Sequence, residues 1–334
     1  MVQTGMTEQR RRWPVPPSLL VGLAPMLVFA AISAWRARPS DDYPSLGLTV
    51  DSVVQALVIP EGIAALGLAV VVTALGWWRI ATVDPTRGRP RWAWTAPALI
   101  LAVCLARLPL VDWTALPWHY FALLGVGVLF VGFFEELMTR GVLLVGLRRR
   151  LPEFGVWIVS CVLFGLLHLL NALAGAGIGP TLIQVVFAAS FGSVLYVARR
   201  LSGNLLLPVL LHAVWDFGSI AVSATANRGF GDIALAGLLG LVAFAVLVLG
   251  IVAGGVIAWR DDRPRRLRRR WRDVPPNDVP PDDVPPNDVP PEDVPPNDVP
   301  QRDGLPQPGV YARRAVPGGR DLRDSTDTPS GSPS

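Results

Sequence analysis

Two adjacent carboxylates and an arginine lie inside an apolar stretch near the middle of the chain. This stretch, residues 120–147, contains Glu135, Glu136 and Arg140. It is long enough to cross a bilayer as a helix, for which about 20 apolar residues suffice. A charged side chain at the centre of such a helix costs about 2.5 kcal/mol or more, so charges kept there are candidates for a functional site.

The spacing of these three residues separates their expected roles. Glu136 and Arg140 are four residues apart, so they share a helix face and the arginine can neutralise the acid. Glu135 points about 100° away from that face and lacks the same partner. An unpaired buried carboxylate can serve as a general base.

Two of the three histidines of the chain lie inside other apolar stretches. His168 follows Phe164 by one helical turn, and His212 precedes Asp216 by one turn, so each pair shares a face. Charged groups inside a membrane need one another or a water-filled cavity. We therefore expect both histidines to share a cavity with Glu135.

A carboxylate, two imidazoles and water are sufficient for hydrolysis. His212 and Asp216 could be two ligands of one metal ion, or an imidazole held by a carboxylate. A water molecule, ligated or hydrogen-bonded, would be deprotonated by Glu135. The alternative is a proton-coupled carrier, because intramembrane acids and histidines also relay protons. Glu61, after Pro60 in the second apolar run, would fit such a relay or a helix N-terminal cap.

The composition indicates a polytopic membrane protein. The chain is 51% hydrophobic and 17% charged, whereas about 25% of a soluble domain is charged. Its apolar runs cover residues 18–35, 53–78, 94–108, 120–147, 154–174, 180–198, 205–224 and 233–259. We therefore predict an all-α protein with eight transmembrane helices.

The charge distribution predicts the orientation. The basic residues are all arginines, and they gather in the N-terminal tail, in the second, fourth and sixth connections and at the start of the C-terminal tail. By the positive-inside rule both termini face the cytoplasm, as an even number of spans requires. The membrane thus accounts for the basic isoelectric point, and we expect no nucleic-acid partner. The absence of lysine suggests a bacterial protein, which would place it as a multi-pass protein in the plasma (inner) membrane.

Composition also divides the chain into three parts. A cytoplasmic tail, residues 1–17, precedes a transmembrane domain, residues 18–260. The C-terminal tail, residues 261–334, begins with a basic cluster at 263–272, expected to attract anionic lipid headgroups at about 1 kcal/mol per residue. A five-residue repeat of the DVPPN type follows, and its prolines predict an extended, disordered segment.

Taken in order, the motifs resemble those of the CPBP family, the CAAX-protease and bacteriocin-processing or Abi proteins. That family includes the type II CAAX prenyl endopeptidases. The resemblance rests on Glu-Glu-x3-Arg at 135–140, Phe-x3-His at 164–168 and His-x3-Asp at 212–216, and it covers residues 120–224. It implies an eight-helix intramembrane endopeptidase whose site opens to the cytosol and in which Glu135 activates water.

The resemblance also implies roles for the remaining site residues. His168, His212 and Asp216 would bind a divalent metal, expected to be zinc, or stabilise an oxyanion, while Glu136 and Arg140 would structure the site. The substrate would be a peptide or a membrane-associated protein near the cytoplasmic leaflet. The eukaryotic CAAX enzymes usually have Asn at the Asp216 position, a difference that suits metal ligation and weakens the inference of a prenylated substrate. A scaffold or bacteriocin-immunity protein that retains the motifs is a further alternative.

Overall fold

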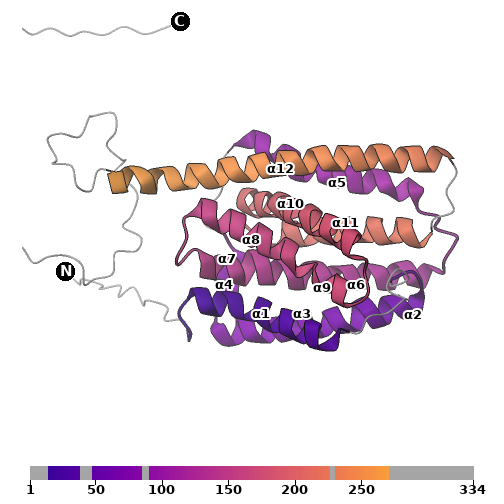
Figure 1. Cartoon of the computed structure of the whole chain (residues 1–334), viewed down its shortest axis with the longest axis horizontal. Helices are drawn as coiled ribbons and strands as arrows, with labels where there is room; N and C mark the ends of the chain where they lie inside the picture. The colour runs from indigo at the N-terminus through magenta and orange to yellow at the C-terminus, as the bar shows by residue number, and fades with distance from the viewer. Residues whose placement is uncertain (1–13, 38–46, 85–89, 226–229, 271–334) are drawn as a thin grey trace, which may run out of the picture. The chain divides into compact units, whose positions relative to one another are not determined.

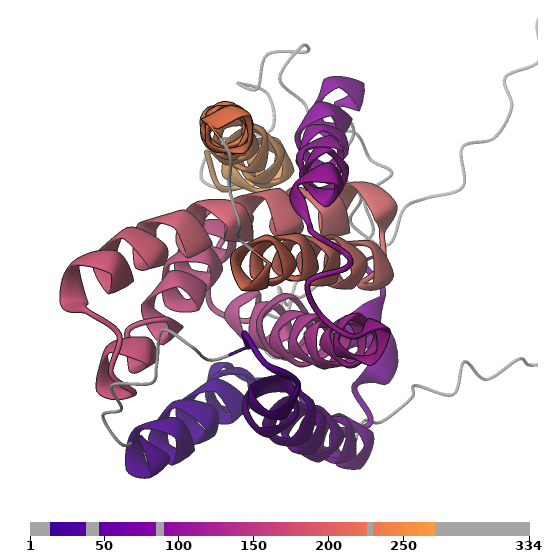
Figure 2. The same cartoon turned by 90° about the vertical axis from the view of Figure 1, so that its right-hand side faces the viewer.

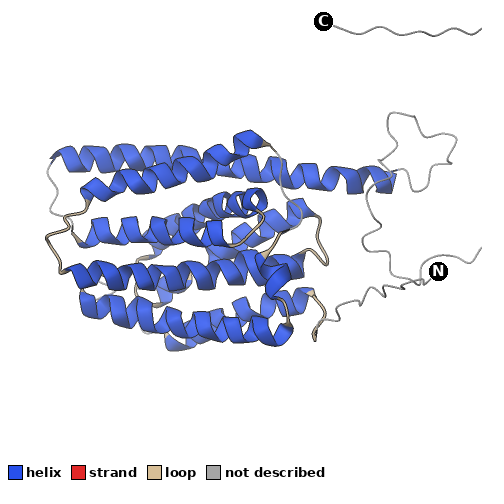
Figure 3. Ribbon diagram, turned by 180° about the vertical axis from the view of Figure 1, so that it is seen from behind, coloured by secondary structure: helices blue, strands red, loops and turns tan. Residues whose placement is uncertain are grey.

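The structure is a computed structural model that describes residues 14–37, 47–84, 90–225 and 230–270. These residues form helices and no strands, apart from an isolated β-bridge between Val83 and Asn204 (Figure 3). Within these ranges, eight helical stretches are long and apolar enough to cross a membrane. This confirms the predicted all-α polytopic fold with eight spans.

The helices are labelled in chain order in Figure 1. They are α1 (Leu19–Arg36), α2 (Val50–Val53), α3 (Ile59–Leu75), α4 (Trp78–Thr82), α5 (Thr95–Arg107), α6 (Trp118–Glu136), α7 (Leu144–Leu147), α8 (Glu153–Leu167), α9 (Leu170–Leu173), α10 (Ile178–Ser202), α11 (Leu206–Ala224) and α12 (Phe230–Arg270). Two π-helical segments, η2 (Val54–Val58) and η5 (Leu137–Leu143), continue α2 into α3 and α6 into α7. Short 3-10 turns, η3 (Arg91–Trp94) and η4 (Leu108–Leu110), flank α5.

The last helix is longer than the sequence predicted. α12 continues to Arg270, beyond the predicted start of the C-terminal tail at residue 261. The proline repeat and the N-terminal tail up to residue 13 lie outside the described residues. The basic cluster at 263–272 falls partly on the end of α12, and its lipid contacts stay a prediction.

The helices that carry the predicted motifs form the centre of the bundle. α6 packs against α11 and α3, while α10 packs against α8 and α12, and Figure 2 shows α10 crossing the others obliquely. Glycines allow two of these contacts to be close. A Cβ at Gly132 of α6 would lie 2.8 Å from the carbonyl oxygen of Val209, and one at Gly165 of α8 would lie 2.5 Å from that of Val185. Small residues permit such close backbone approach between membrane helices.

α4, α7 and α10 end, and α8 begins, at a buried ion cluster, and we call this end of the bundle the basic end. Asp84 is 3.0 Å from Arg148 Nη2, 2.8 Å from Arg200 Nη1 and 3.7 Å from Arg199 Nε. Arg148 also pairs with Glu153, 2.8 Å away. Burial alone would lower the pKa of the Arg148 guanidinium, but the carboxylates of Glu153 and Asp84 outweigh it and raise that pKa above its usual range. The cluster ties together four separate segments of the chain.

Candidate active site

The two adjacent glutamates lie where α6 changes into the π-helical segment η5. α6 ends at Glu136, and η5 follows it without a break. The hydroxyl of Thr139 donates a hydrogen bond to the carbonyl oxygen of Glu135, and it accepts one from Arg140 Nη1 at 2.8 Å. π-Helical turns are rare and are found often at functional sites. The widened turn therefore marks the segment that the sequence singled out.

Glu136 and Arg140 form the buried ion pair that their spacing predicts. Arg140 Nη1 is 2.8 Å from Glu136 Oε1, and both side chains have 0% exposure. The guanidinium lies 4.1 Å from the centre of the Phe164 ring, within cation–π range. Gly192 of α10 makes the space, because a Cβ there would come within 2.6 Å of Arg140 Nη2. The arginine is thus held from three helices.

His212 of α11 connects the carboxylates of two helices. Its Nδ1 is 3.1 Å from Glu136 Oε1. Its Nε2 is 3.7 Å from Glu135 Oε2 and 3.5 Å from Asp216 Oδ2. The ring packs edge-on against Phe164. Both ring nitrogens therefore face acids, and the predicted pairing of His212 with Asp216 on one face is present.

His168 is oriented by its own helix. It caps α8, and its Nδ1 lies 3.1 Å from the carbonyl oxygen of Phe164. A carbonyl can only accept, so Nδ1 carries the proton and donates, and in the neutral ring Nε2 is left as an acceptor. The Phe164 ring contacts both histidines, with centroids 5.3 Å from His168 and 5.9 Å from His212.

A cavity of about 1020 Å³ brings four of the six predicted residues together. Its wall includes Glu135, His168, His212 and Asp216. The Glu135 and Asp216 side chains are 20% and 25% exposed, so water can reach both acids. Glu136 and Arg140 do not line the cavity; they lie fully buried behind its wall. The arrangement separates acids that face the cavity from a pair that supports the wall.

Glu61 of α3 lines the same cavity, and the sequence analysis did not assign it to the hydrolytic site. Within the described part of the chain, its Oε2 and that of Glu135 are buried and have no hydrogen-bond partner. The signal in the sequence was the same as for Glu135, a carboxylate inside an apolar run. Pro60 precedes Glu61, and a proline suits the first turn of a helix, which made a structural position equally plausible. Glu61 does lie in the first turn of α3.

The predicted zinc ligands are not arranged as a metal site. Among the described residues, no group of three or more His, Cys, Asp or Glu is placed to hold a metal ion. Protein zinc sites use at least three such ligands at about 2.0–2.3 Å from the ion. His168, His212 and Asp216 share the cavity without meeting that condition, so zinc stays a prediction from the sequence.

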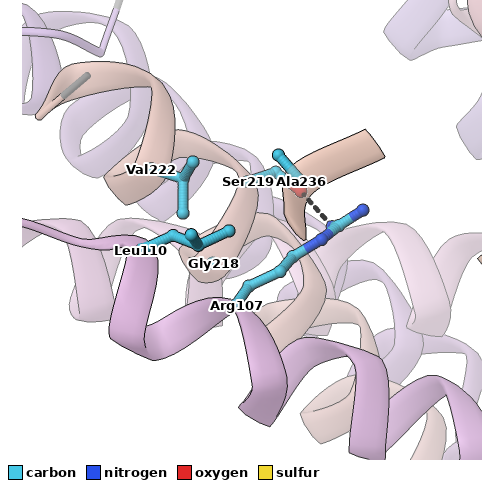
Figure 4. A pocket seen from close by; sticks show the side chains of 6 residues that line it. All are labelled: Arg107, Leu110, Gly218, Ser219, Val222 and Ala236. Carbon is cyan, nitrogen blue, oxygen red and sulfur yellow. Dashed lines mark hydrogen bonds between the residues drawn. The ribbon is translucent and has the colours of Figure 1, made fainter. Parts of the chain in front are cut away.

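A second, smaller pocket of about 210 Å³ lies beside α11 and shares the wall residue Ser219 with the large cavity (Figure 4). Arg107 of α5 reaches across it, and its Nη1 donates to the Ser219 hydroxyl at 3.2 Å. The guanidinium also lies 4.2 Å from the centre of the Trp215 ring. Ser219 and Trp215 both line the large cavity. Arg107 therefore contacts two residues of the large cavity's wall, Ser219 and Trp215, from outside that cavity.

Residues 117–218 match the family model described as Type II CAAX prenyl endopeptidase Rce1-like. The matched segment runs from the start of α6 into α11 and contains all six predicted site residues. It confirms the resemblance stated from the motifs and supports a membrane-embedded protease that acts on a peptide or protein. No curated protein and no solved structure matches the chain.

Proposed function

We propose that this multi-pass membrane protein is an intramembrane endopeptidase in which Glu135 activates a water molecule. One observation carries the proposal. Of two adjacent acids, Glu136 is fully buried and is neutralised by Arg140 at 2.8 Å, whereas Glu135 lines the cavity and its side chain is 20% exposed. A general base needs a carboxylate that is free to accept a proton.

The chemistry follows from the groups around that water. Glu135 accepts a proton from water while the water oxygen attacks the carbonyl carbon of the peptide. His168 accepts a hydrogen bond from the water through Nε2, because Nδ1 is committed to Phe164. The proton taken by Glu135 passes to the leaving amine as the carbon–nitrogen bond breaks, which gives a carboxylic acid and an amine.

The oxyanion that forms during the attack needs a donor. As an imidazolium, His212 donates from both nitrogens, with Nδ1 toward Glu136 and Nε2 between Glu135 and Asp216, the two acids that line the cavity. Removing one donor of this kind costs about 2.7–4 kcal/mol of activation free energy in other hydrolases. Asp216, 3.5 Å from Nε2, orients the ring. Asp216 is therefore proposed to position His212 and not to contact the substrate.

The substrate class is a peptide or a membrane-associated protein in the plasma membrane. The Asp216 position, occupied by Asn in the eukaryotic CAAX enzymes, gives no support for prenylated substrates in particular. The scissile bond would lie at the inner part of the cavity, between membrane helices, where electrostatic stabilisation is stronger than in bulk water.

Reconstituted protein provides the test. The wild type and Glu135→Gln are incubated in proteoliposomes with a defined peptide mixture, and new termini are identified by mass spectrometry. We expect cleavage by the wild type and none above background by the variant. Proton flux with no cleavage of any peptide would instead support the carrier.

The zinc prediction has a separate test. Metal content is measured for the purified wild type beside His168→Ala and His212→Ala. Stoichiometric zinc lost from both variants would support the predicted ligand set, and a wild type without zinc would overturn it.

A further inference from the structure

The cavity runs from the site toward one end of the bundle. From Glu135 and His212 its wall continues to positions at the far ends of four helices, namely Ala37 after α1, Gly47 before α2, Ala174 after α9 and Ser223 near the end of α11. We call this end the mouth end. α2 lies there in Figure 1, whereas α4 and α7 lie at the opposite, basic end. The exposed side chains of Arg36, Gln184 and Ser223 also belong to the wall, so the cavity reaches the surface at the mouth end.

The basic end is closed to the site. Every residue from 136 to 147, the stretch between Glu135 and the basic end, is buried. The ion cluster covers the same end, with Asp84, Arg199 and Arg200 exposed by 1%, 0% and 0%. Of the residues that the structure describes, none from 76–84, 148–152 or 203–205 contributes to the cavity wall. A substrate can therefore reach Glu135 from the mouth end and not along α6 from the basic end.

The arginines relate these two ends to the two sides of the membrane. Arg79 of α4 and Arg148 to Arg150 lie at the basic end, with Arg199 and Arg200 at the end of α10 and Arg260 in α12. The mouth end carries fewer, with Arg36 at the end of α1, Arg107 at the end of α5 and none in the connection at 174–177. Short connections rich in arginine stay in the cytoplasm. The mouth end then faces the extracytoplasmic side.

We infer that the active site opens to the extracytoplasmic side and that its substrate is a peptide segment presented there, either secreted or part of a membrane-anchored protein. The inference rests on the proposed peptidase function and gives it a direction. It reverses the sequence-based expectation of a site that opens to the cytosol. That expectation came from the family resemblance, and the spacing of residues within single helices could not show which end of the bundle the other helices cover.

The chemistry of the mouth suits a peptide. Asn171 and Gln184 are hydrogen-bonded to each other at 2.9 Å, and Ser33 and Ser223 line the same cavity. These groups donate to and accept from a peptide backbone, and the exposed guanidinium of Arg36 suits an acidic side chain or a terminal carboxylate. The volume of about 1020 Å³ is at the upper limit of ligand pockets, about 300–1,000 Å³, which leaves room for an extended segment.

Cysteine labelling tests the direction of access. Ser33→Cys and Ser223→Cys place a thiol on the cavity wall, and Arg150→Cys places one on the exposed turn at the basic end. The native Cys104 and Cys161 are 1% and 6% exposed, so the unsubstituted full chain sets the background. A membrane-impermeant maleimide is added to right-side-out and to inverted vesicles from a bacterial host. We expect Ser33→Cys and Ser223→Cys to be labelled in right-side-out vesicles only, and Arg150→Cys in inverted vesicles only.

Labelling of the two cavity cysteines in inverted vesicles would overturn the inference, whichever side Arg150→Cys reports. The measurement does not depend on catalysis. A chain that cleaves no peptide but shows the expected labelling would refute the peptidase and keep the direction of access. A chain that cleaves peptides but is labelled from the cytoplasmic side would support the peptidase and refute the direction of access.

Discussion

The ion cluster at the basic end and the candidate active site both bury carboxylates among arginine and aromatic side chains, yet they balance charge differently. At the basic end Asp84 faces three arginines within 4 Å. Around the cavity, Arg140 pairs with Glu136, while one oxygen each of Glu61, Glu135 and Glu136 lacks a hydrogen-bond partner among the described residues. Arginines compensate the negative charge at the basic end, whereas carboxylates are in excess around the cavity.

This difference indicates what each cluster does. A buried carboxylate without compensation lowers stability, and fully paired networks are what a folded structure normally selects. Proteins depart from that pattern mainly at functional sites. The basic end therefore holds helices together, whereas the site keeps an acid available for chemistry. Substitutions in one cluster or the other should therefore differ in their effects on stability and on cleavage.

Arg140→Met should have the largest effect. It leaves Glu136 fully buried without its cation, and breaking a buried ion pair from one side costs about 3–5 kcal/mol. Unfolding by heat or denaturant in detergent measures the change. Arg150→Met, on an exposed turn, is the control and should stay within about 0.5 kcal/mol of the wild type. Equal stability of Arg140→Met and the control would show that the pair does not support the wall.

Asp84→Asn should lower the free energy of unfolding by less than Arg140→Met does. The amide keeps one acceptor oxygen, and Arg200 still pairs with Asp261, so the loss is that of charge-assisted hydrogen bonds, about 1.5–3 kcal/mol. The same unfolding assay applies. The rate of peptide cleavage per folded molecule should not change, and a specific loss of rate would mean that the cluster belongs to the site.

Gly192→Ala should act through Arg140. The new Cβ would lie 2.6 Å from Arg140 Nη2 and 3.2 Å from the Phe164 ring, so the guanidinium must shift, at an overpacking cost of about 1–3 kcal/mol. Gly179→Ala on the same helix has nothing within 4 Å and serves as the matched control, with unchanged or slightly raised stability. Identical unfolding of the two variants would contradict the contact.

Glu61→Gln should change stability least. Glu61 is one of several acids that face a single cavity. Replacing it relieves like-charge repulsion, which offsets the loss of its favourable interactions with water. The free energy of unfolding should therefore change by no more than about 1 kcal/mol. Unfolding and cleavage are measured on the same preparation. A loss of stability as large as that of Asp84→Asn would assign Glu61 to the framework.

The sequence was sufficient for the spans and for the ion pair of the site, because both depend on local spacing. Eight apolar runs predicted eight helices, and the spacing of Glu136 and Arg140 predicted their contact. The approach of His212 to both glutamates depends on how α11 packs on α6, where Gly132 allows the close contact. No single helix encodes that distance.

The ion cluster at the basic end also depends on contacts between separate helices, which the sequence did not reveal. The basic end looked like a set of solvent-facing arginines that mark topology, whereas Arg199 and Arg200 are fully buried. Their partner Asp84 is 64 residues from Arg148 in sequence and more than 110 from Arg200, so spacing could not suggest it. The contribution of Glu61 and the direction of the cavity likewise arise only once several helices are packed.

A comparison of Glu135→Gln with Asp84→Asn tests the central claim most directly, because both replace an acid inside the helix bundle by its amide. Cleavage per folded molecule and unfolding are measured for both variants. Loss of a general base lowers the rate by about 10²–10⁴-fold, so Glu135→Gln should lose cleavage with its stability unchanged or raised. Asp84→Asn should lose stability and keep its rate. Wild-type cleavage by folded Glu135→Gln would contradict the proposal that this carboxylate activates water.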